Sequence, residues 1–368
     1  MATIMAEEIE KETGFKPVKG LLNEKGKLRL PNDYKIDSVV PDYSILNEIN
    51  YKYPASDAYF AYMTRGCVRK CPFCAVPNIE PIYVDYIPIK KQIKIINDKY
   101  GSKKDLLLLD NNVLASSNFD QIIDEIKEIG FFKGTKLNNR NRYVDFNQGV
   151  DLRFLTREKM KRLAELPIKP LRIAFDHIQL KDKYIEKIEW AAEYGLIYLS
   201  NYILYNFEDT PEDFYERLRI NVELNERLGI KIFSFPMKYI PITNRDRKFV
   251  GGKQWNPRYL RSIQCILHAT HGVVGPGKEF FEAAFGKNLK EFKKLLLMPD
   301  DYIIYREKYK NNGAMEWREL YKTVSLSLKQ KKEFHNIVHT NRLNNGVYSK
   351  YKKVNILLSH YKKKCREL

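Results

Sequence analysis

Three of the chain's five cysteines stand within eight residues, and this cluster constrains the protein more than any other feature of the sequence. Cys67, Cys71 and Cys74 have the spacing C-x3-C-x2-C and directly follow an apolar, aromatic run at residues 59–63. Three thiolates so close together can face one inorganic centre, and soft sulfur ligands favour iron–sulfur clusters or zinc. A four-iron cluster with three cysteine ligands keeps one iron open, and an open position marks a catalytic metal site.

Zinc completed by a distant histidine or by Cys265 is the alternative occupant, and thiols that ligate nothing are a further alternative. Zinc sites usually appear in sequences as two pairs, C-x2-C with a second C-x2-C or with H-x3-H. No second pair stands near residues 67–74. The spacing therefore favours an iron–sulfur cluster, although the spacing alone leaves zinc open.

Length and composition set the broad class. A chain of 368 residues suits about two domains, or one α/β barrel with appendages. No apolar run approaches the roughly 18 residues of a membrane span, and residues 1–8 lack the pattern of a signal peptide. Clustered cysteines fit a reducing compartment better than a disulfide framework. We therefore expect a cytoplasmic protein without membrane contact.

The charge is strongly basic and unevenly distributed. The formal net charge is +18, and residues 301–368 hold 16 Lys and Arg against 6 Asp and Glu. Such an excess suggests a polyanionic partner, with nucleic acid first in line. A solvated, lysine-rich surface is the alternative explanation.

Strand-like and helix-like segments alternate through the middle of the chain. The expected strands are residues 59–63, 106–109, 143–147, 170–176, 196–205 and 231–237, and the expected helices are residues 87–100 and 119–129, one from 156, residues 184–194 and one from 210. Regular alternation predicts a parallel sheet with helices outside it, curled by right-handed crossovers into a partial barrel. Six units are fewer than the eight of a closed barrel. The fold class is therefore α/β, a partial (β/α)6 TIM-like barrel.

Three regions follow from this pattern: an N-terminal extension (1–58), the partial barrel (59–242) and a basic, mainly helical C-terminal region (243–368). The extension is rich in Gly and Pro, which predicts an extended lead-in with short strands at most. Residues 243–252, which include Arg245 and Arg247, look like a linker or substrate loop. Residues 301–368 interleave lysines with seven tyrosines, a combination typical of single-stranded nucleic-acid binders. The same tyrosines could equally pack this region on the barrel.

In this order of motifs the chain resembles the radical S-adenosylmethionine (SAM) superfamily. Members carry C-x3-C-x2-C in the loop after the first barrel strand, with an aromatic residue before the last cysteine, and Phe73 fills that place. Residues 41–46 resemble the segment before the barrel in members with a cobalamin domain, but 58 residues are too few for that domain. The resemblance implies a [4Fe–4S] cluster, SAM and an electron donor such as flavodoxin or ferredoxin. It also implies reductive cleavage of SAM to a 5′-deoxyadenosyl radical.

The resemblance places further candidate SAM contacts at the C-terminal ends of the strands, where barrel ligands lie. Asp110, Asn111 and Asn112 stand where many members hold the methionyl amino group, although an ordinary Asx turn is the alternative. Further candidates are Gln148, Asp151, Arg153, Arg172, Asp176, Asn201 and Met237. Arg153 could pair with the SAM carboxylate. Arg172 could pair with that carboxylate or, internally, with Asp176, which is also the ribose candidate.

The motif Cys265-x2-His268-x2-His271 is a loose signal for a second metal, with core or substrate-pocket packing as the alternative. We expect a radical SAM enzyme whose substrate is a nucleic acid or nucleotide. A protein, peptide or small metabolite is the alternative substrate. A non-catalytic, zinc-stabilised nucleic-acid-binding protein is the contrasting class.

Overall fold

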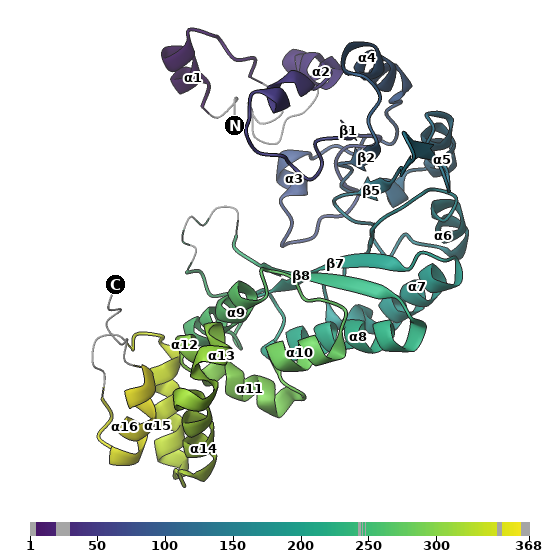
Figure 1. Ribbon diagram of the computed structural model, residues 1–368. Coiled ribbons are helices and arrows are strands. Elements are labelled where there is room, and N and C mark those ends of the chain that lie inside the picture. Colours follow the sequence, from purple (N-terminus) through teal and green to yellow (C-terminus); the bar gives the residue numbers. More distant parts are fainter. Residues whose placement is uncertain are drawn as a thin grey trace. The chain divides into compact units, whose positions relative to one another are not determined.

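The computed structural model describes residues 5–19, 30–241, 244, 246, 248–343 and 348–361. Figure 1 shows the elements in chain order, and the chain divides into two compact units. The first unit comprises Met1–Ala174 and Asp182–Asn201, and the second comprises Phe175–Lys181 and Tyr202–Leu368. The boundary between the units therefore falls inside a β-strand.

The N-terminal segment is helical in its described part, so the expectation of an extended lead-in with short strands is wrong there. Its elements are α1 (Ala6–Thr13), α2 (Pro31–Ser38) and the 3-10 helix η1 (Tyr43–Asn47). Pro31 misled the prediction because it occupies the first turn of α2, where a missing N–H costs nothing. The buried Tyr43 ties this segment to β1 (Ala58–Ala61), since its hydroxyl accepts from the N–H of Phe60 at 3.1 Å.

Parallel strands form the centre of the first unit. After β1 they are β2 (Asp105–Leu108), β5 (Val144–Phe146), β6 (Leu171–Arg172) and the start of β7 (Tyr198–Tyr205). The order β1-β2-β5 has Tyr59 beside Leu106 and Leu106 beside Val144. Isolated parallel bridges at Val144 and Val150 continue this pairing toward β6, which pairs in parallel with β7. The strands thus follow one another in chain order, as the alternating pattern predicts.

Helices connect these strands, as the sequence pattern predicts. They are α3 (Val76–Ile79), α4 (Lys90–Tyr100), α5 (Phe119–Glu128), α6 (Arg157–Leu163), α7 (Lys181–Glu193) and α8 (Pro211–Leu228). The predicted start of α8 is confirmed, because the Thr210 hydroxyl accepts from the N–H of Asp213 and Pro211 takes the first helical position. A hairpin of β3 (Lys136–Leu137) and β4 (Arg140–Asn141) interrupts the alternation and was not predicted.

In the second unit the end of β7 neighbours β8 (Lys231–Lys238). The α/β class with parallel pairing is confirmed, and in the described part of the chain no strand pairing returns to β1.

The C-terminal region is helical, as predicted. Its elements are α9 (Pro257–Ala269), α10 (Lys278–Phe285), α11 (Leu289–Leu297), α12 (Asp300–Ile304), α13 (Arg306–Tyr309), the π-turn η4 (Lys310–Ala314), α14 (Met315–Thr323), α15 (Leu328–His339), α16 (Lys352–Leu358) and η5 (Ser359–Tyr361). Arg258 is buried and pairs with Asp300 at 2.7 Å, which joins α9 to α12. Trp317 and Tyr361 are buried in the core of this region.

The predicted domain boundaries stay predictions, and the second one falls at Ile242 and Thr243, outside the described residues. Arg245 and Arg247 of the predicted linker lie outside them as well. Among the described residues, no helix has the length and apolar character needed to cross a membrane. The cytoplasmic location stays a prediction.

Candidate functional site

The three clustered cysteines lie in one hydrogen-bonded loop that follows β1. Arg65 and Val84 form an antiparallel bridge, in which each N–H donates to the other's carbonyl at 3.1 and 2.9 Å. This bridge closes the loop of residues 66–83, which includes α3. The thiols are therefore held on a short, closed segment at the C-terminal end of a parallel strand, where ligands of such sheets bind.

Glu80 is the centre of the loop's hydrogen bonding. One carboxylate oxygen accepts from the Arg65 guanidinium at 2.8 Å, and the other accepts from the Gly66 N–H at 2.8 Å and the Asn111 amide at 2.7 Å. Gly66 has φ +68, and a Cβ there would stand 2.3 Å from the carbonyl oxygen of Ile82. Only glycine accepts this backbone conformation so close to a neighbouring chain segment.

Cys67, Cys71 and Cys74 are partly exposed thiols, and no disulfide joins them to one another or to another described cysteine. Cys67 Sγ accepts from the backbone N–H of Arg69 at 3.3 Å and from the Asn112 amide at 3.4 Å. Cys74 Sγ accepts from the N–H of Val76 at 3.5 Å. N–H donors directed at sulfur are suited to thiolates, whose charge they stabilise.

Three thiolates are a donor set that both iron–sulfur clusters and zinc accept. In the described part of the chain, no three His, Cys, Asp or Glu side chains converge as ligands of one ion would. Thiolates of a four-iron cluster bind different irons, so they surround a cube and need not meet at a point.

Asp110 fastens the end of β2 to the start of the cysteine loop. Its Oδ1 accepts from the backbone N–H of Met63 at 2.9 Å, and from the N–H and hydroxyl of Thr64. Burial raises the pKa of Asp110 to about 6, although these hydrogen bonds favour the charged form. The contacts run between strands, so Asp110 does not form the local Asx turn that was the alternative. Its buried Oδ2 has no hydrogen-bond partner among the described residues.

Asn111 and Asn112 connect β2 to the same loop. Asn111 donates to Glu80, and Asn112 donates to Cys67 as stated above. The backbone carbonyl of Asn112 accepts from the Tyr83 hydroxyl at 3.1 Å, and burial raises the pKa of Tyr83 so that this donor stays protonated. Asn112 Oδ1 is buried and has no hydrogen-bond partner among the described residues. The three residues predicted after the second strand are thus placed beside the cysteines.

The candidates after the third strand and in β6 are engaged by other residues of the first unit. Gln148 is exposed in a turn. Arg153 pairs with Asp151 through bonds of 2.6 and 2.9 Å. Arg172 forms a bidentate ion pair with Asp145 of β5, and both hydrogen bonds are 2.8 Å long. Asp145 is a partner that the sequence analysis did not propose, because the pairing depends on the register between β5 and β6.

Three candidates remain to be placed. Asn201 lies in the first unit, where it is buried and donates to the Tyr184 hydroxyl at 2.8 Å. Asp176 and Met237 lie in the second unit. The Asp176 carbonyl accepts from buried Arg217 at 3.1 Å, and Met237 is 51% exposed on β8. Their predicted contacts with SAM stay predictions.

The second metal motif is not assembled. Cys265 is buried on α9, whereas His268 on the same helix and His271 beyond its end are exposed. Burial raises the pKa of the Cys265 thiol to about 12, so it stays protonated and is a poor ligand. Packing is the better account of this motif.

Sequence reasoning missed four residues that organise the sites: Glu80, Tyr83, Asp145 and Arg217. Arg217 is fully buried and donates to the carbonyls of Phe175, Asp176 and Leu204, besides pairing with Asp209 at 2.9 Å. A buried arginine with several acceptors implies a backbone turn that it holds in place. Asp213 stands four residues before Arg217 on the same helix face, so Arg217 looks like an ordinary helix ion pair and the sequence carries no signal of its backbone contacts.

Part of the chain is similar to known proteins. Residues 61–220 match the model of the family described as "Radical SAM superfamily". Among curated proteins, the NADPH-dependent 7-cyano-7-deazaguanine reductase of Thermoanaerobacter pseudethanolicus is 24% identical over 110 residues, 29% of this chain and 77% of that protein.

Two solved proteins show low structural similarity. The radical SAM methyltransferase TsrM of Kitasatospora setae, with cobalamin and a [4Fe–4S] cluster bound, has 14% identity and a TM-score of 0.37 over 49% of this chain and 34% of its own. SuiB of Streptococcus suis bound to S-adenosylmethionine has 14% identity and a TM-score of 0.34 over 51% of this chain and 40% of its own. The chain thus spans less than half of either structure.

The family match covers the cysteine loop and the strands from β2 to β7. The loop geometry and the donor set agree with that match. Residues 61–220, which include the cysteine loop and most of the strands, are thus similar to the radical SAM superfamily.

Proposed function

We propose that this chain is a radical SAM enzyme in which Cys67, Cys71 and Cys74 ligate three irons of a [4Fe–4S] cluster and leave the fourth to SAM. The observation that carries this proposal is the closed loop of residues 66–83, which holds all three thiols beside β2 and directs N–H groups at two of them. When bound, the cluster and SAM supply a 5′-deoxyadenosyl radical that removes a hydrogen atom from the substrate.

The chain's own groups would position and tune these cofactors. The N–H donors to Cys67 and Cys74 stabilise negative charge on sulfur, which makes the reduced state easier to reach. Asp110 Oδ2 and Asn112 Oδ1 are buried acceptors without a donor among the described residues. An ammonium group supplies such donors, so both oxygens are candidate contacts for the methionyl amino group of SAM.

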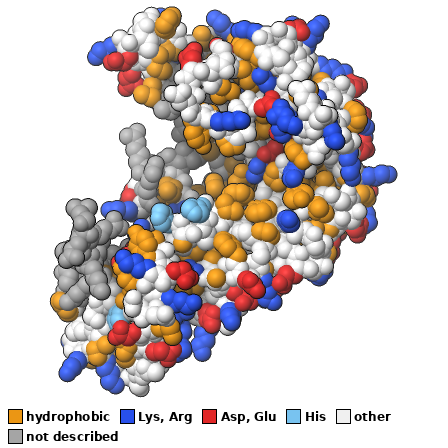
Figure 2. Space-filling view, viewed as in Figure 1, with side chains coloured by type: hydrophobic (Ala, Val, Ile, Leu, Met, Phe, Trp, Pro, Cys, Tyr) orange, Lys and Arg blue, Asp and Glu red, His pale blue; other side chains and the backbone are white. Residues whose placement is uncertain are grey.

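The proposed substrate is a nucleic acid or nucleotide. The net charge of +18 and the basic excess of residues 301–368 support a polyanionic partner. The curated relative is named for a deazaguanine base, which agrees with a base-containing substrate but assigns no residue of this chain. On the face seen in Figure 2, Lys and Arg side chains are spread widely instead of forming one patch. Net charge therefore supports the class of partner without locating its binding site.

The C-terminal tyrosines contribute less to this proposal than their number suggests. Tyr361 is buried, and Tyr321 stacks on Trp317 with ring centroids 5.1 Å apart. Tyr305 and Tyr348 are exposed, at 43% and 61%. Only such exposed rings could stack on bases, so most of the binding must come from phosphate contacts.

Anaerobic Cys67→Ala protein tests the ligand assignment. We expect loss of the cluster absorbance and of 5′-deoxyadenosine formation from SAM and dithionite, with an unchanged circular dichroism spectrum. Cys265→Ala is the matched control, because Cys265 lies on α9 in the second unit. It should retain about four irons and full SAM cleavage. Normal turnover in Cys67→Ala would contradict the assignment.

A further inference from the structure

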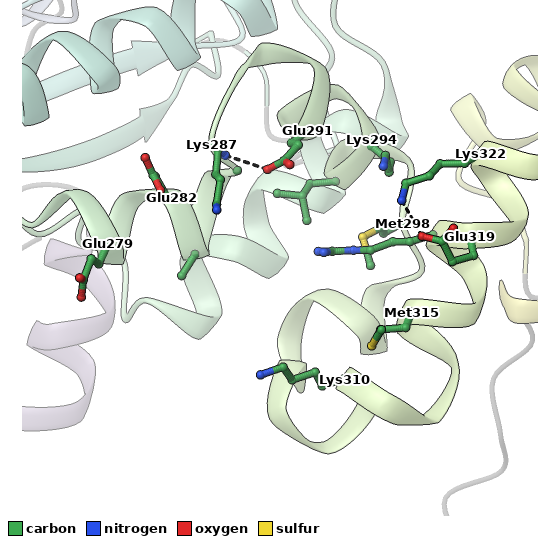
Figure 3. Close-up of a pocket in the computed structure, with 14 residues that line it drawn as sticks. Glu279, Glu282, Lys287, Glu291, Lys294, Met298, Lys310, Met315, Glu319 and Lys322 are labelled. Atoms are coloured by element: carbon green, nitrogen blue, oxygen red, sulfur yellow. Dashed lines mark hydrogen bonds and ion pairs between the residues drawn. The ribbon is translucent and has the colours of Figure 1, made fainter.

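A cavity of about 630 Å³ lies in the second unit, lined by α10, α11, η4 and α14 (Figure 3). Its volume is in the range of ligand pockets, roughly 300–1,000 Å³. Neither the cysteine loop nor any candidate SAM contact lines it. The cavity is therefore a separate feature that the cluster chemistry does not explain.

Cationic side chains gather in this pocket. They are Lys287, Lys294, Lys310, Arg318 and Lys322. Four acidic residues also line it, but two of them are engaged within the chain. Glu319 pairs with Lys322 at 2.5 Å, and Glu291 accepts from the backbone N–H of Lys287 at 2.9 Å. Within the described residues no carboxylate forms an ion pair with Lys294, Lys310 or Arg318.

The cations are close enough to repel one another. Burial, followed by Lys322 and Arg318, lowers the pKa of Lys294, although Glu291 and Glu319 act in the opposite direction. Burial, followed by Arg318, lowers the pKa of Arg306 to about 10. Figure 3 shows Lys294 and Lys322 next to each other above Met298. Around Lys294, the like charges of Lys322 and Arg318 cost free energy that Glu291 and Glu319 offset in part and that a bound anion would recover.

A glycine turn and two buried apolar residues shape the pocket. Gly313 has φ +108, and a Cβ there would stand 2.5 Å from the Tyr302 hydroxyl. This glycine permits the turn η4, whose two ends place Lys310 and Met315 at the pocket. Leu295 and Met298 are buried and form an apolar floor. The pocket is thus a defined feature of the fold with cations above an apolar base.

We propose that this pocket binds backbone phosphates of the nucleic-acid substrate through Lys294, Arg318 and Lys322. The inference rests on the proposed nucleic-acid substrate and locates part of its binding site. A guanidinium can donate two parallel hydrogen bonds to one phosphate, and neighbouring lysines add positive charge on flexible side chains. Because a backbone phosphate carries negative charge regardless of sequence, the contact adds affinity without base specificity.

The double variant Lys294→Gln with Arg318→Gln tests the proposal in the full-length protein. Binding to a fluorescein-labelled single-stranded oligonucleotide is measured by anisotropy across a salt series. Each lost phosphate contact on a single strand reduces the slope of log affinity against log salt by about 0.7. Two lost contacts should lower that slope by about 1.4 and weaken binding about 25-fold at about 0.1 M salt.

Lys329→Gln with Lys332→Gln is the matched control, because it removes the same charge from exposed positions of α15 outside the pocket. This control should keep the wild-type slope. A third variant adds charge instead: Glu319→Gln releases Lys322 from its pair and should tighten binding. Glu307→Gln, an exposed position outside the pocket, should tighten it less.

The outcomes separate this inference from the proposed function. A wild-type protein that shows no salt-dependent oligonucleotide binding at micromolar concentration would overturn the proposed substrate and the pocket's ligand together. Wild-type binding that survives equally in the double variant and its control would overturn the pocket alone. Displacement of the oligonucleotide by equimolar ADP would assign the pocket to free nucleotides and overturn the backbone assignment.

Discussion

The cysteine loop and the pocket near α11 and α14 both concentrate polar side chains, but they satisfy them differently. In the loop, Glu80 accepts from three donors, and Asp110 accepts from Met63 and Thr64. In the pocket, Lys294 and Arg318 have no ion pair with any described carboxylate. Glu80 and Asp110 lie in buried or largely buried places, where polar groups are normally paired. Lys294 is partly buried and Arg318 is exposed, so solvent can serve them until an anion binds. Substitutions should therefore cost stability in the loop and affinity in the pocket.

Among substitutions in the cysteine loop, Gly66→Ala should reduce stability most. A Cβ at φ +68 costs about 1–2 kcal/mol by itself, and its approach to 2.3 Å from the Ile82 carbonyl adds a clash with backbone. We expect at least about 3 kcal/mol of destabilisation and poor cluster incorporation. Urea unfolding and iron analysis measure both effects.

Gly134→Ala is the matched control, because Gly134 has φ +88 and open space around its Cβ position. It should cost only the conformational strain of about 1–2 kcal/mol and leave the iron content unchanged. Equal effects of the two substitutions would show that the loop tolerates displacement at Gly66.

Glu80→Ala should come next in size. The change leaves the Gly66 N–H and part of the Arg65 guanidinium without their acceptor in a largely buried place. Losing the acceptor of a buried donor costs about 1–3 kcal/mol, so we expect about 2–3 kcal/mol and a lower iron content. Glu80→Gln keeps an acceptor and should cost less. A wild-type melting temperature for Glu80→Ala would contradict the central role given to this residue.

The difference between these two residues shows what sequence reasoning reaches. The spacing of Cys67, Cys71 and Cys74 is local, so the sequence predicts the loop and its cofactor. Glu80 lies 14 residues beyond Gly66, and nothing in the intervening sequence marks it as the acceptor. The strands could be predicted because burial on both faces leaves continuous apolar runs such as residues 106–109.

Contacts between residues far apart in the sequence, and sites assembled from separate helices, could not be predicted from the sequence. Arg172 could be recognised as a buried charge that needs a partner, but its pairing with Asp145 depends on strand register. The pocket draws its lining from residues 279–322, in which no short motif signals an anion site. Pro31 was misread because a proline begins helices as readily as it breaks them.

Asp110→Asn tests an intermediate case in the comparison of paired and unpaired groups, because only one carboxylate oxygen of Asp110 is hydrogen-bonded among the described residues. Its pKa is raised from 3.8 to about 6, so the folded protein holds a proton that the unfolded chain releases between those values. The contribution of Asp110 to the free energy of unfolding therefore falls as the pH rises from about 4 to about 6. A shift of about two pKa units corresponds to roughly 3 kcal/mol.

Asparagine keeps an acceptor for Thr64 and carries no charge, so Asp110→Asn should be more stable than wild type above pH 6. The advantage should shrink toward pH 4. Urea unfolding at a series of pH values measures it. A variant that is less stable than wild type at pH 7.5 would show that the charge of Asp110 is compensated within the fold.

Lys294→Gln should have the smallest effect on stability, and it tests the pocket side of the comparison. Its pKa is lowered by burial and by Lys322 and Arg318, so the folded protein holds this proton less tightly than the unfolded chain does. At neutral pH the charge is kept at a cost, and its removal should leave stability unchanged or raise it by up to about 0.5 kcal/mol. The gain should vanish as the pH rises through the lowered pKa toward 10.5, where both states lose the proton.

Arg258→Gln removes the same charge from a paired, buried position and should cost about 3 kcal/mol. A comparable loss in Lys294→Gln, measured by thermal unfolding, would mean that Lys294 supports the fold, and the distinction between paired structure and unpaired binding groups would then fail in this region.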